Sequence, residues 1–172
     1  GEEPDDNSLC IVSPLGIDAT TAAIEEGLNP EHTIAIDTLF NLSLRRTLMK
    51  TPVTDPAYTK SAHGLFASDD TPVTVVRDST GFVSQRIVAM IVNIGCSIAQ
   101  SGAATPEDID KAVMLGLGYP HGPLGFGDTV GADRILEILI STFEMTGDPR
   151  YRPTPWLRRR ALLGLSLLTT ET

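Results

Sequence analysis

The spacing of the apolar positions changes near residue 78, and this change divides the chain into two parts. In the first part, short apolar runs alternate with stretches in which apolar residues recur at helical spacing. The predicted elements are strands at residues 9 to 13, 33 to 37 and 71 to 78, and helices at residues 18 to 28 and 56 to 67. Strand, helix and strand in this order form the repeating unit of a parallel α/β sheet, so we expect a small α/β half.

The second part follows the 3.6-residue spacing of helices almost throughout. The predicted helices cover residues 82 to 98, 105 to about 115, about 128 to 146, and 154 to 168. Thr105, Pro106 and Asp108 have the spacing of a capping box at the start of the second of these helices. Its expected core face consists of Ile109, Ala112 and Val113.

The predicted helix over residues 128 to 146 is apolar nearly all the way round, and the glycine-rich residues before it are predicted to form a loop. Its apolar residues are Val130, Ile135, Leu136, Ile138, Leu139, Ile140 and Phe143. A solvent-facing helix of a monomer does not carry so much apolar surface. We therefore expect this helix to be either central in its part of the molecule or at a subunit interface.

The composition is that of a globular protein, and its charge excludes one class of partner. The 172 residues include 22 acidic and 13 basic ones, for a formal net charge of −9. Such a surface repels a polyanion unless bases are gathered locally, so we expect no nucleic-acid partner. Arg158, Arg159 and Arg160 are consecutive on a predicted helix and point in different directions, so we expect a solvated helix end there.

The two cysteines and the apolar runs indicate the compartment. Cys10 lies in a predicted strand and Cys96 in a predicted apolar helix, so we expect reduced, buried thiols and a cytoplasmic protein. The longest apolar runs are far shorter than the roughly 20 residues of a membrane span, and the acidic start GEEPDDNS is unlike a signal peptide. We expect no membrane association. The absence of an initiating Met suggests a piece of a longer chain.

Three segments carry distinctive motifs, namely DSTGFVSQR at residues 78 to 86, ATPEDIDKAVMLGLGYPHGPLGFGDTVG at 104 to 131, and DPRYRPTP at 148 to 155. Together they resemble the C-terminal helical domain of 3-hydroxyacyl-CoA dehydrogenases, whose pattern is D-x-x-G-F-x-x-N-R, then S-P-E-D-I-D and G-L-G-x-P-x-G-P. The first part of the chain is similar to the end of that family's NAD-binding domain. Ser13, Pro30-Glu31 and Asp37 fall at the family's distances.

This resemblance implies the fold class α/β plus all-α. We expect a truncated, catalytically degenerate Rossmann-like βαβ unit over residues 1 to 78 and a helical 3-hydroxyacyl-CoA dehydrogenase C-terminal domain over residues 79 to 172.

Four family positions that carry the dehydrogenase chemistry hold other residues here. By the resemblance, the histidine base falls at Asp37, the glutamate that orients it at Met49, an oxygen-polarising serine at Gly16, and an asparagine at Gln85. A carboxylate is a far weaker base than imidazole, and methionine has no charge with which to stabilise an imidazolium. Glycine offers no side-chain donor, and the longer glutamine displaces its amide by roughly 1 Å. We expect no retained catalytic residue.

The cofactor site of the family is not recognisable in the sequence. A dinucleotide site requires G-x-G-x-x-G between a strand and a helix. The dense glycines here, Gly116, Gly118 and Gly122, follow a helix and enclose Pro120. We therefore expect no cofactor bound to this chain, whereas the resemblance implies NAD for the complete enzyme.

The histidines do not indicate a metal or a hydrolase. His32, His63 and His121 have no Cys, Asp or Glu at metal-ligand spacing, so we expect no metal site. A triad of Ser13, His32 and Asp37 is arithmetically possible but lacks the G-x-S-x-G elbow.

The resemblance also points to residues that line the substrate cleft or a subunit interface. They are Phe82, Gln85, Arg86, Tyr119, Pro120, Gly122, Pro123 and Asp128. From the residues alone, Phe82 is a core anchor, Arg86 reaches for a carboxylate or carbonyl, and Gly118 to Pro123 form a fixed interhelical turn.

The resemblance implies the C-terminal portion of a long bacterial NAD-dependent L-3-hydroxyacyl-CoA dehydrogenase of the 3-hydroxybutyryl-CoA type, active in fatty acid metabolism or phenylacetate degradation. Its partners would be an N-terminal catalytic half of the same chain, the acyl-CoA substrate and a second copy in a homodimer.

Two alternatives to this function remain open. One is a non-catalytic acyl-CoA-binding or scaffold module, in which Arg45, Arg46 and Lys50 meet the CoA phosphates. The other is an independently active dehydrogenase, with Asp37 as base and Gln85 as oxyanion donor.

Overall fold

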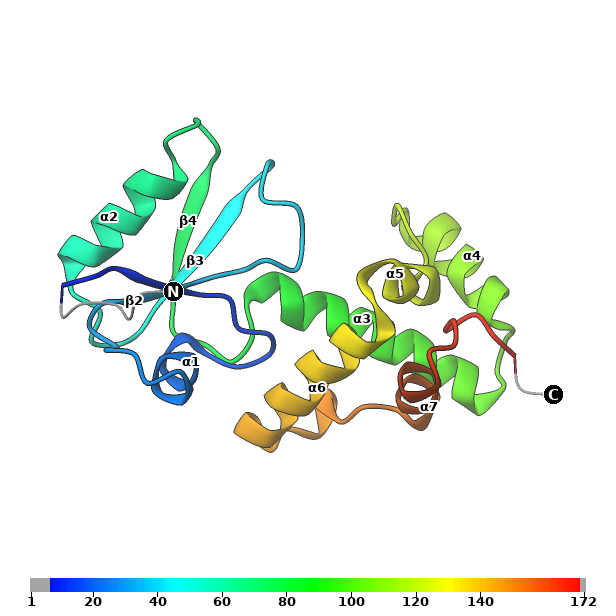
Figure 1. The fold of residues 1–172 in the computed structure, drawn as a ribbon. Coiled ribbons are helices and arrows are strands. Elements are labelled where there is room, and N and C mark those ends of the chain that lie inside the picture. The colour runs from blue at the N-terminus through cyan, green and yellow to red at the C-terminus, as the bar shows by residue number, and fades with distance from the viewer. Residues whose placement is uncertain (1–6, 171–172) are drawn as a thin grey trace. The chain divides into compact units, whose positions relative to one another are not determined.

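The computed structural model describes residues 7 to 170, which form two compact units (Figure 1). The first unit comprises Gly1–Phe82 and the second Val83–Thr172, so the boundary falls inside the DSTGFVSQR segment. The first unit contains a sheet with two helices, and the described part of the second consists of helices and their connections.

A four-stranded sheet, with its strands in chain order, forms the first unit. The strands are β1 (Cys10–Val12), β2 (Thr33–Ile36), β3 (Arg46–Lys50) and β4 (Val73–Arg77). β1 and β2 are parallel, as are β3 and β4, but β2 and β3 are antiparallel. The predicted strand, helix and strand over residues 9 to 37 therefore form a parallel unit as expected, but the sheet as a whole is mixed and not parallel throughout. The sequence pattern misses β3 because its residues RTLMK begin and end with a charged side chain and leave only a short apolar run.

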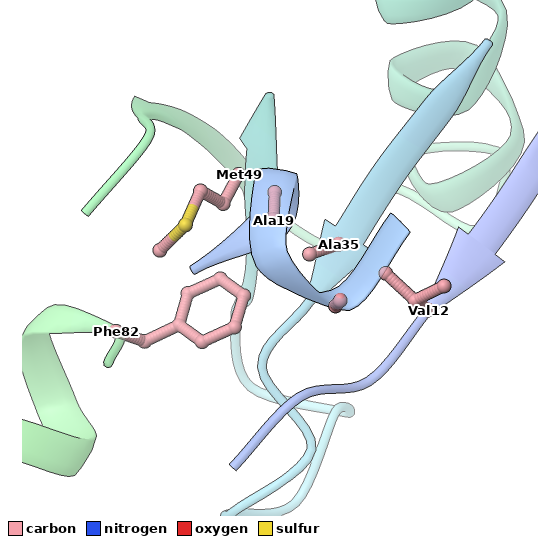
Figure 2. Packing of buried hydrophobic residues seen from close by; sticks show 6 residues of the cluster. Val12, Ala19, Ala35, Met49 and Phe82 are labelled. Atoms are coloured by element: carbon pink, nitrogen blue, oxygen red, sulfur yellow. The ribbon is translucent and has the colours of Figure 1, made fainter. Parts of the chain in front are cut away.

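One helix covers each face of this sheet. The helices are α1 (Ala19–Glu25) and α2 (Pro56–Phe66). Successive strand residues point to opposite faces, so Ala35 and Met49 join the cluster under α1, while Ile34 and Leu48 join the cluster under α2. Phe82 completes the α1 cluster and is fully buried, which confirms it as a core anchor (Figure 2).

Two carboxylates hold the N-terminus of α1. Asp18 is the N-cap and accepts a hydrogen bond from the backbone N of Thr21 at 2.7 Å. Asp78, the first residue of DSTGFVSQR, accepts from the backbone N of Ala19 at 2.8 Å and from Thr20. These bonds satisfy amides that have no partner within the helix, and negative charge is favourable at this end. Asp78 therefore ties the segment after β4 to α1.

The second unit is a bundle of helices around α3. The helices are α3 (Val83–Ser101), α4 (Pro106–Leu117), α5 (Pro123–Val130), α6 (Ala132–Thr146), the short 3₁₀ helix η1 (Pro149–Tyr151) and α7 (Pro155–Leu163). α3 packs against α4, α5, α6 and α7. Thr105 is confirmed as the N-cap of α4, because its Oγ1 accepts from the backbone N of Asp108 at 3.2 Å.

Helix boundaries after residue 120 differ from those predicted. The predicted glycine-rich loop contains most of α5, and α6 begins at Ala132 instead of near residue 128. Gly131 separates the two helices at φ +108°, a conformation that residues with a Cβ rarely adopt. α7 likewise ends before Gly164, at φ +65°, and does not reach residue 168. Glycine is a poor helix former, which hides α5 from the pattern.

The burial of α6 supports its expected central position, whereas the burial of α4 contradicts most of its expected core face. α6 is central in its unit, and its buried apolar residues are Ile135, Leu136, Ile138 and Leu139. Its apolar surface is thus covered within the unit and does not by itself indicate a subunit interface. On α4, Ile109 is buried as expected, but Ala112 is exposed and Val113 only half-buried, so the expected core face is wrong beyond its first residue.

α3 is the helix among residues 7 to 170 whose length and composition would allow it to cross a membrane. However, 44% of its apolar window is buried inside the structure. α3 packs against four other helices of its unit.

Candidate functional site

Two of the family positions, Asp37 and Met49, lie on neighbouring antiparallel strands. Asp37 directly follows β2, and its backbone N donates to Thr47 O at 3.0 Å. Met49 lies in β3, opposite Ala35. Because alternate residues share a face, Asp37, Ala35 and Met49 belong to the same face of the sheet. The structure thus brings these two positions to adjacent strands on one face.

Met49 is part of the apolar core of the first unit. It is fully buried in the cluster that contains Phe82 and Val12 (Figure 2). The backbone N of Ser79 donates to its Sδ, with an N to S distance of 3.4 Å. A carboxylate in this cluster would lose its hydration among apolar side chains, which is costly for a charged group. The environment of Met49 therefore suits packing and not charge.

Asp37 and Gly16 are shaped by local backbone geometry. Asp37 is 7% exposed, and its Oδ1 accepts from the backbone N of Leu39 at 3.1 Å. This contact forms an Asx turn immediately after β2. Gly16 has φ +80°, where a residue with a Cβ is strained. A serine at this position would therefore carry a backbone cost.

Gln85 and Arg86 lie in the first turn of α3. Gln85 is fully buried. The guanidinium of Arg86 donates to the hydroxyl of Tyr151, with an Nε to Oη distance of 3.1 Å. Tyr151 is itself buried and belongs to the DPRYRPTP segment, so Arg86 holds that segment against α3.

Gly122 and Asp110 form a packing contact between α4 and α5. A Cβ on Gly122 would lie 2.6 Å from the Cα of Asp110, which leaves no room for a side chain. The carboxylate of Asp110 accepts from the backbone N of Leu124 and of Gly125, both at 2.8 Å. These residues of the motif therefore fix the connection between the helices.

The remaining cleft or interface candidates are divided between surface and interior. Tyr119 and Pro120 are exposed, whereas Pro123 is buried. Asp128 is half-buried, and its Oδ1 accepts from the backbone N of Leu167 at 2.8 Å. Asp128 therefore anchors the chain that follows α7.

Sequence reasoning misses Asn93, a buried amide near the middle of α3. Its Nδ2 donates to Arg152 O at 3.0 Å, and its Oδ1 accepts from the backbone N of Thr154 at 2.9 Å. An unpaired buried amide is costly, so a polar residue on the apolar face of a helix signals a specific partner. That signal is present in the sequence, but the partner is about 60 residues away along the chain.

The basic cluster near the C-terminus is only partly a solvated helix end. Arg158 and Arg159 are exposed as expected. Arg160 is 3% exposed, its guanidinium carbon lies 3.2 Å from the ring centroid of Trp156, and its Nε donates to Thr169 O at 3.1 Å. The expectation is therefore wrong for Arg160, which makes a buried cation–π contact.

The cysteines and histidines occupy separate places. Cys96 is a free, buried thiol whose pKa is raised to about 12 by burial, and Cys10 is free and half-buried. His32 stacks on Tyr58 with ring centroids 4.3 Å apart. Within the described residues, 7 to 170, no three side chains that could ligate a metal come together.

The three bases considered for CoA phosphates do not form one site. Arg45 precedes β3, whereas Arg46 is its first residue. Arg46 binds Asp69 through two nitrogen to oxygen contacts of 2.7 Å, and this hydrogen bonding lowers the pKa of Asp69. Arg45 donates to Thr74 Oγ1 at 2.6 Å. Of the three bases, Lys50 is left as a candidate for a phosphate, and it lies on the same face of the sheet as Arg46.

The architecture is that of an α/β protein with a helical C-terminal domain, since a small mixed sheet with one helix on each face is followed by a bundle of helices. A family model for the 3-hydroxyacyl-CoA dehydrogenase C-terminal domain matches residues 81–168. The chain belongs to this family, which confirms the resemblance seen in the motifs.

Curated relatives and solved structures agree with this assignment. The chain is 38% identical over 117 residues to a 3-hydroxyadipyl-CoA dehydrogenase of Escherichia coli, an alignment that covers 68% of this chain and 25% of the relative. It is 38% identical over 119 residues to a 3-hydroxybutyryl-CoA dehydrogenase of Mycobacterium tuberculosis, covering 68% and 41%. The chain therefore aligns with between a quarter and two fifths of these relatives.

Two crystal structures share the fold. FadB2 of M. tuberculosis matches with a TM-score of 0.84 and 26% identity, over 98% of this chain and 62% of that chain. A 3-hydroxybutyryl-CoA dehydrogenase of E. coli K12 matches with a TM-score of 0.79 and 32% identity, over 94% of this chain and 34% of that chain.

Proposed function

We propose that this chain is the C-terminal portion of a long bacterial NAD-dependent L-3-hydroxyacyl-CoA dehydrogenase, whose N-terminal half performs the reaction. The observation that carries this proposal is Met49. The family position that requires a carboxylate is occupied by a thioether inside an apolar cluster. Membership of the family supports the reaction class of the parent enzyme.

The chemistry required of the family explains why the chain alone is inactive in this proposal. Oxidation of a 3-hydroxyacyl-CoA needs a base that takes the hydroxyl proton while hydride leaves for the nicotinamide. Met49 cannot orient or stabilise a protonated base, and Gly16 has no side chain to polarise the substrate oxygen. The contribution of this chain is then structural: it completes the acyl-CoA cleft and holds subunits together.

NAD belongs to the parent enzyme in this proposal and not to this chain. The sequence has no G-x-G-x-x-G between a strand and a helix. Calorimetric titration of the chain with NAD tests this point. We expect no heat of binding, and micromolar affinity would contradict the assignment.

The substrate class follows from the relatives. They are named for 3-hydroxybutyryl-CoA and 3-hydroxyadipyl-CoA, so we infer a short-chain L-3-hydroxyacyl-CoA as the substrate of the parent enzyme, in fatty acid metabolism or phenylacetate degradation. The place of action is then the cytoplasm. Tyr119 and Pro120 are the exposed members of the predicted cleft set and are the first residues to test for contact with the acyl chain.

A homodimer is the proposed assembly, and α3 provides the surface for it. Ile87, Ile94 and Ile98 are 55%, 56% and 38% exposed. Their spacing of seven and four residues places them on one side of the helix, as in helix pairs that bury an apolar seam. Burial of these side chains against a second copy would remove the apolar stripe from water.

Sedimentation velocity at tens of micromolar distinguishes the assembly states. We expect a dimer, and we expect Ile94→Glu to be monomeric because it places a charge in the seam. Leu115→Glu is the matched control, since Leu115 is 86% exposed on α4 and lies outside the stripe. A monomeric parent chain, or a dimer that survives Ile94→Glu, would contradict this interface.

A further inference from the structure

An open hollow in the first unit has a mostly apolar wall, which includes Pro56, and is bordered by basic side chains that none of the contacts above uses. Lys50 at the end of β3, together with Lys60 and His63 of α2, borders a space of about 310 Å³. Thr59 and Val75 form part of its wall. All of these residues belong to the first unit, so the hollow is defined within it.

The fold explains why these residues gather. His63 follows Lys60 by three residues and Thr59 by four. These three residues are therefore neighbours along one side of α2. Lys50 shares a sheet face with Leu48, which packs in the cluster that includes Ala62 of α2. The hollow therefore lies where α2 crosses the end of the sheet.

Positive charge accumulates at this place although the chain as a whole is acidic. The register of the parallel strands sets Arg77 opposite Lys50. Like charges directly opposite each other in a sheet are destabilising. The ion pairs found among residues 7 to 170 involve Arg46 and Arg150, and none of them neutralises Lys50, Lys60 or Arg77. The cluster thus lacks an anion.

An unsatisfied hydroxyl lies in the same wall. The Oγ1 atom of Thr59 is buried and has no hydrogen-bond partner among the described residues. Buried polar atoms are nearly always paired, and a missing partner calls for an explanation. Because this atom is buried, the hydroxyl can donate to an oxygen held in the hollow only after rotation about the χ1 bond of Thr59.

We propose that this hollow binds a phosphate group, either as an inorganic anion or as part of a small phosphorylated molecule. A dianionic phosphate offers several acceptor oxygens for the ammonium groups of Lys50 and Lys60, the imidazole of His63 and the hydroxyl of Thr59. Its charge offsets the repulsion between Lys50 and Arg77. The site lies on the sheet face opposite that of Met49, so it is separate from the family positions and does not rest on the proposed function.

Calorimetric titration of the chain with inorganic pyrophosphate at low ionic strength tests the proposal. We expect one site per chain, and we expect the double variant Lys50→Gln/Lys60→Gln to bind at least about tenfold more weakly, since each lost charge-assisted hydrogen bond is substantial. Thr59→Val keeps the side-chain shape and removes the hydroxyl. It should weaken binding by about threefold while leaving the thermal unfolding midpoint nearly unchanged.

The matched control is Lys111→Gln/Arg158→Gln, which removes the same charge from exposed positions in the second unit. It should bind pyrophosphate as the parent chain does. Equal weakening in both double variants would mean that net charge alone attracts the anion, and would overturn the proposal. Absence of measurable binding to the folded parent chain would overturn it as well.

A parallel titration with CoA identifies the source of the phosphate. Affinity equal to or tighter than that for pyrophosphate assigns the site to nucleotide-linked phosphates, provided that the Lys50→Gln/Lys60→Gln variant loses it. A CoA affinity about tenfold weaker assigns the site to a free inorganic anion, because the nucleotide then adds only steric cost.

Discussion

The two units of this molecule use the family's sequence in different ways. In the helical unit, motif residues are kept and make internal contacts, as Asp110 does at the start of α5 and Asp128 does after α7. In the α/β unit, the positions expected to carry chemistry keep their places on the strands, but Met49 packs in the core and Asp37 caps a turn. The comparison shows that a fold is maintained by internal contacts, whereas chemistry depends on a few side chains that packing does not require.

The largest expected effect is that of restoring the family carboxylate in the α/β unit. Met49→Glu buries a charge among apolar side chains and should lower the free energy of unfolding at pH 7 by about 4 kcal/mol. Burial raises the pKa of such a glutamate in the folded state, so the part of the loss that is due to charge should shrink as the pH falls below this raised pKa and should vanish below the unfolded pKa. Urea unfolding at pH 7 and pH 4 measures both.

Met49→Leu is the control for this experiment. It conserves the apolar character and most of the volume, so it should cost less than about 1.5 kcal/mol and show no added pH dependence. A Met49→Glu variant as stable as Met49→Leu at pH 7 would mean that a charge has a partner at this position, and the contrast between the units would be lost.

The next largest effect on stability is expected from a glycine of the helical unit. Gly122→Ala places a Cβ against the backbone of Asp110 and should destabilise the chain by about 3 kcal/mol, because backbone cannot move aside as a flexible side chain can. Gly116→Ala is the matched control. A Cβ there meets nothing within 4 Å, and the change should stabilise α4 by about 0.5 to 1 kcal/mol. Equal effects of the two changes, measured by thermal unfolding, would count against the packing role of the motif.

A smaller effect is expected from Asn93. Asn93→Ala leaves Arg152 O and the backbone N of Thr154 without their partner and should cost about 2 kcal/mol. Ile94→Ala, on the exposed side of the same helix, should cost well under 1 kcal/mol in the monomer. Hydrogen exchange of the Thr154 amide provides a local measurement, because it should accelerate in Asn93→Ala only.

The smallest effect concerns the exposed ion pair of the α/β unit. Hydrogen bonding to Arg46 lowers the pKa of Asp69 in the folded state, so the pair contributes stability above the unfolded pKa and loses it as the pH falls. Asp69→Asn should therefore narrow the difference between the thermal unfolding midpoints at pH 7 and pH 3. Asp70→Asn is the neighbouring control, since asparagine tolerates its φ of +62°. A pH dependence unchanged by Asp69→Asn would remove this pair from the account.

Each unit contains elements that can be predicted from the sequence and elements that cannot. The helix around Val92 is evident from the periodic spacing of its buried residues, and the strand TIAI is evident as a short continuous apolar run that is buried throughout. α5 is not evident, because Gly127 lacks a side chain for a tertiary reason: its Cβ would lie 2.5 Å from Leu167 Cδ1. β3 is hidden by its charged ends.

The candidate site was accessible to sequence reasoning only through resemblance. Motif distances located Asp37 and Met49, and the strand register places them on one face. The roles of Asn93 and Arg160 depend on partners brought together by the fold, Thr154 in one case and Thr169 in the other. Periodicity describes the face on which a residue lies, but not the acceptor that it meets.

The most direct test of the account is turnover by the chain alone. NADH formation would be followed by absorbance after the chain is mixed with NAD and L-3-hydroxybutyryl-CoA. We predict a rate equal to that of the buffer, because Gly16, Asp37, Met49 and Gln85 do not provide the base, its orienting carboxylate or the family's oxygen-polarising groups. Turnover above the buffer rate that is abolished by Asp37→Ala would contradict this account.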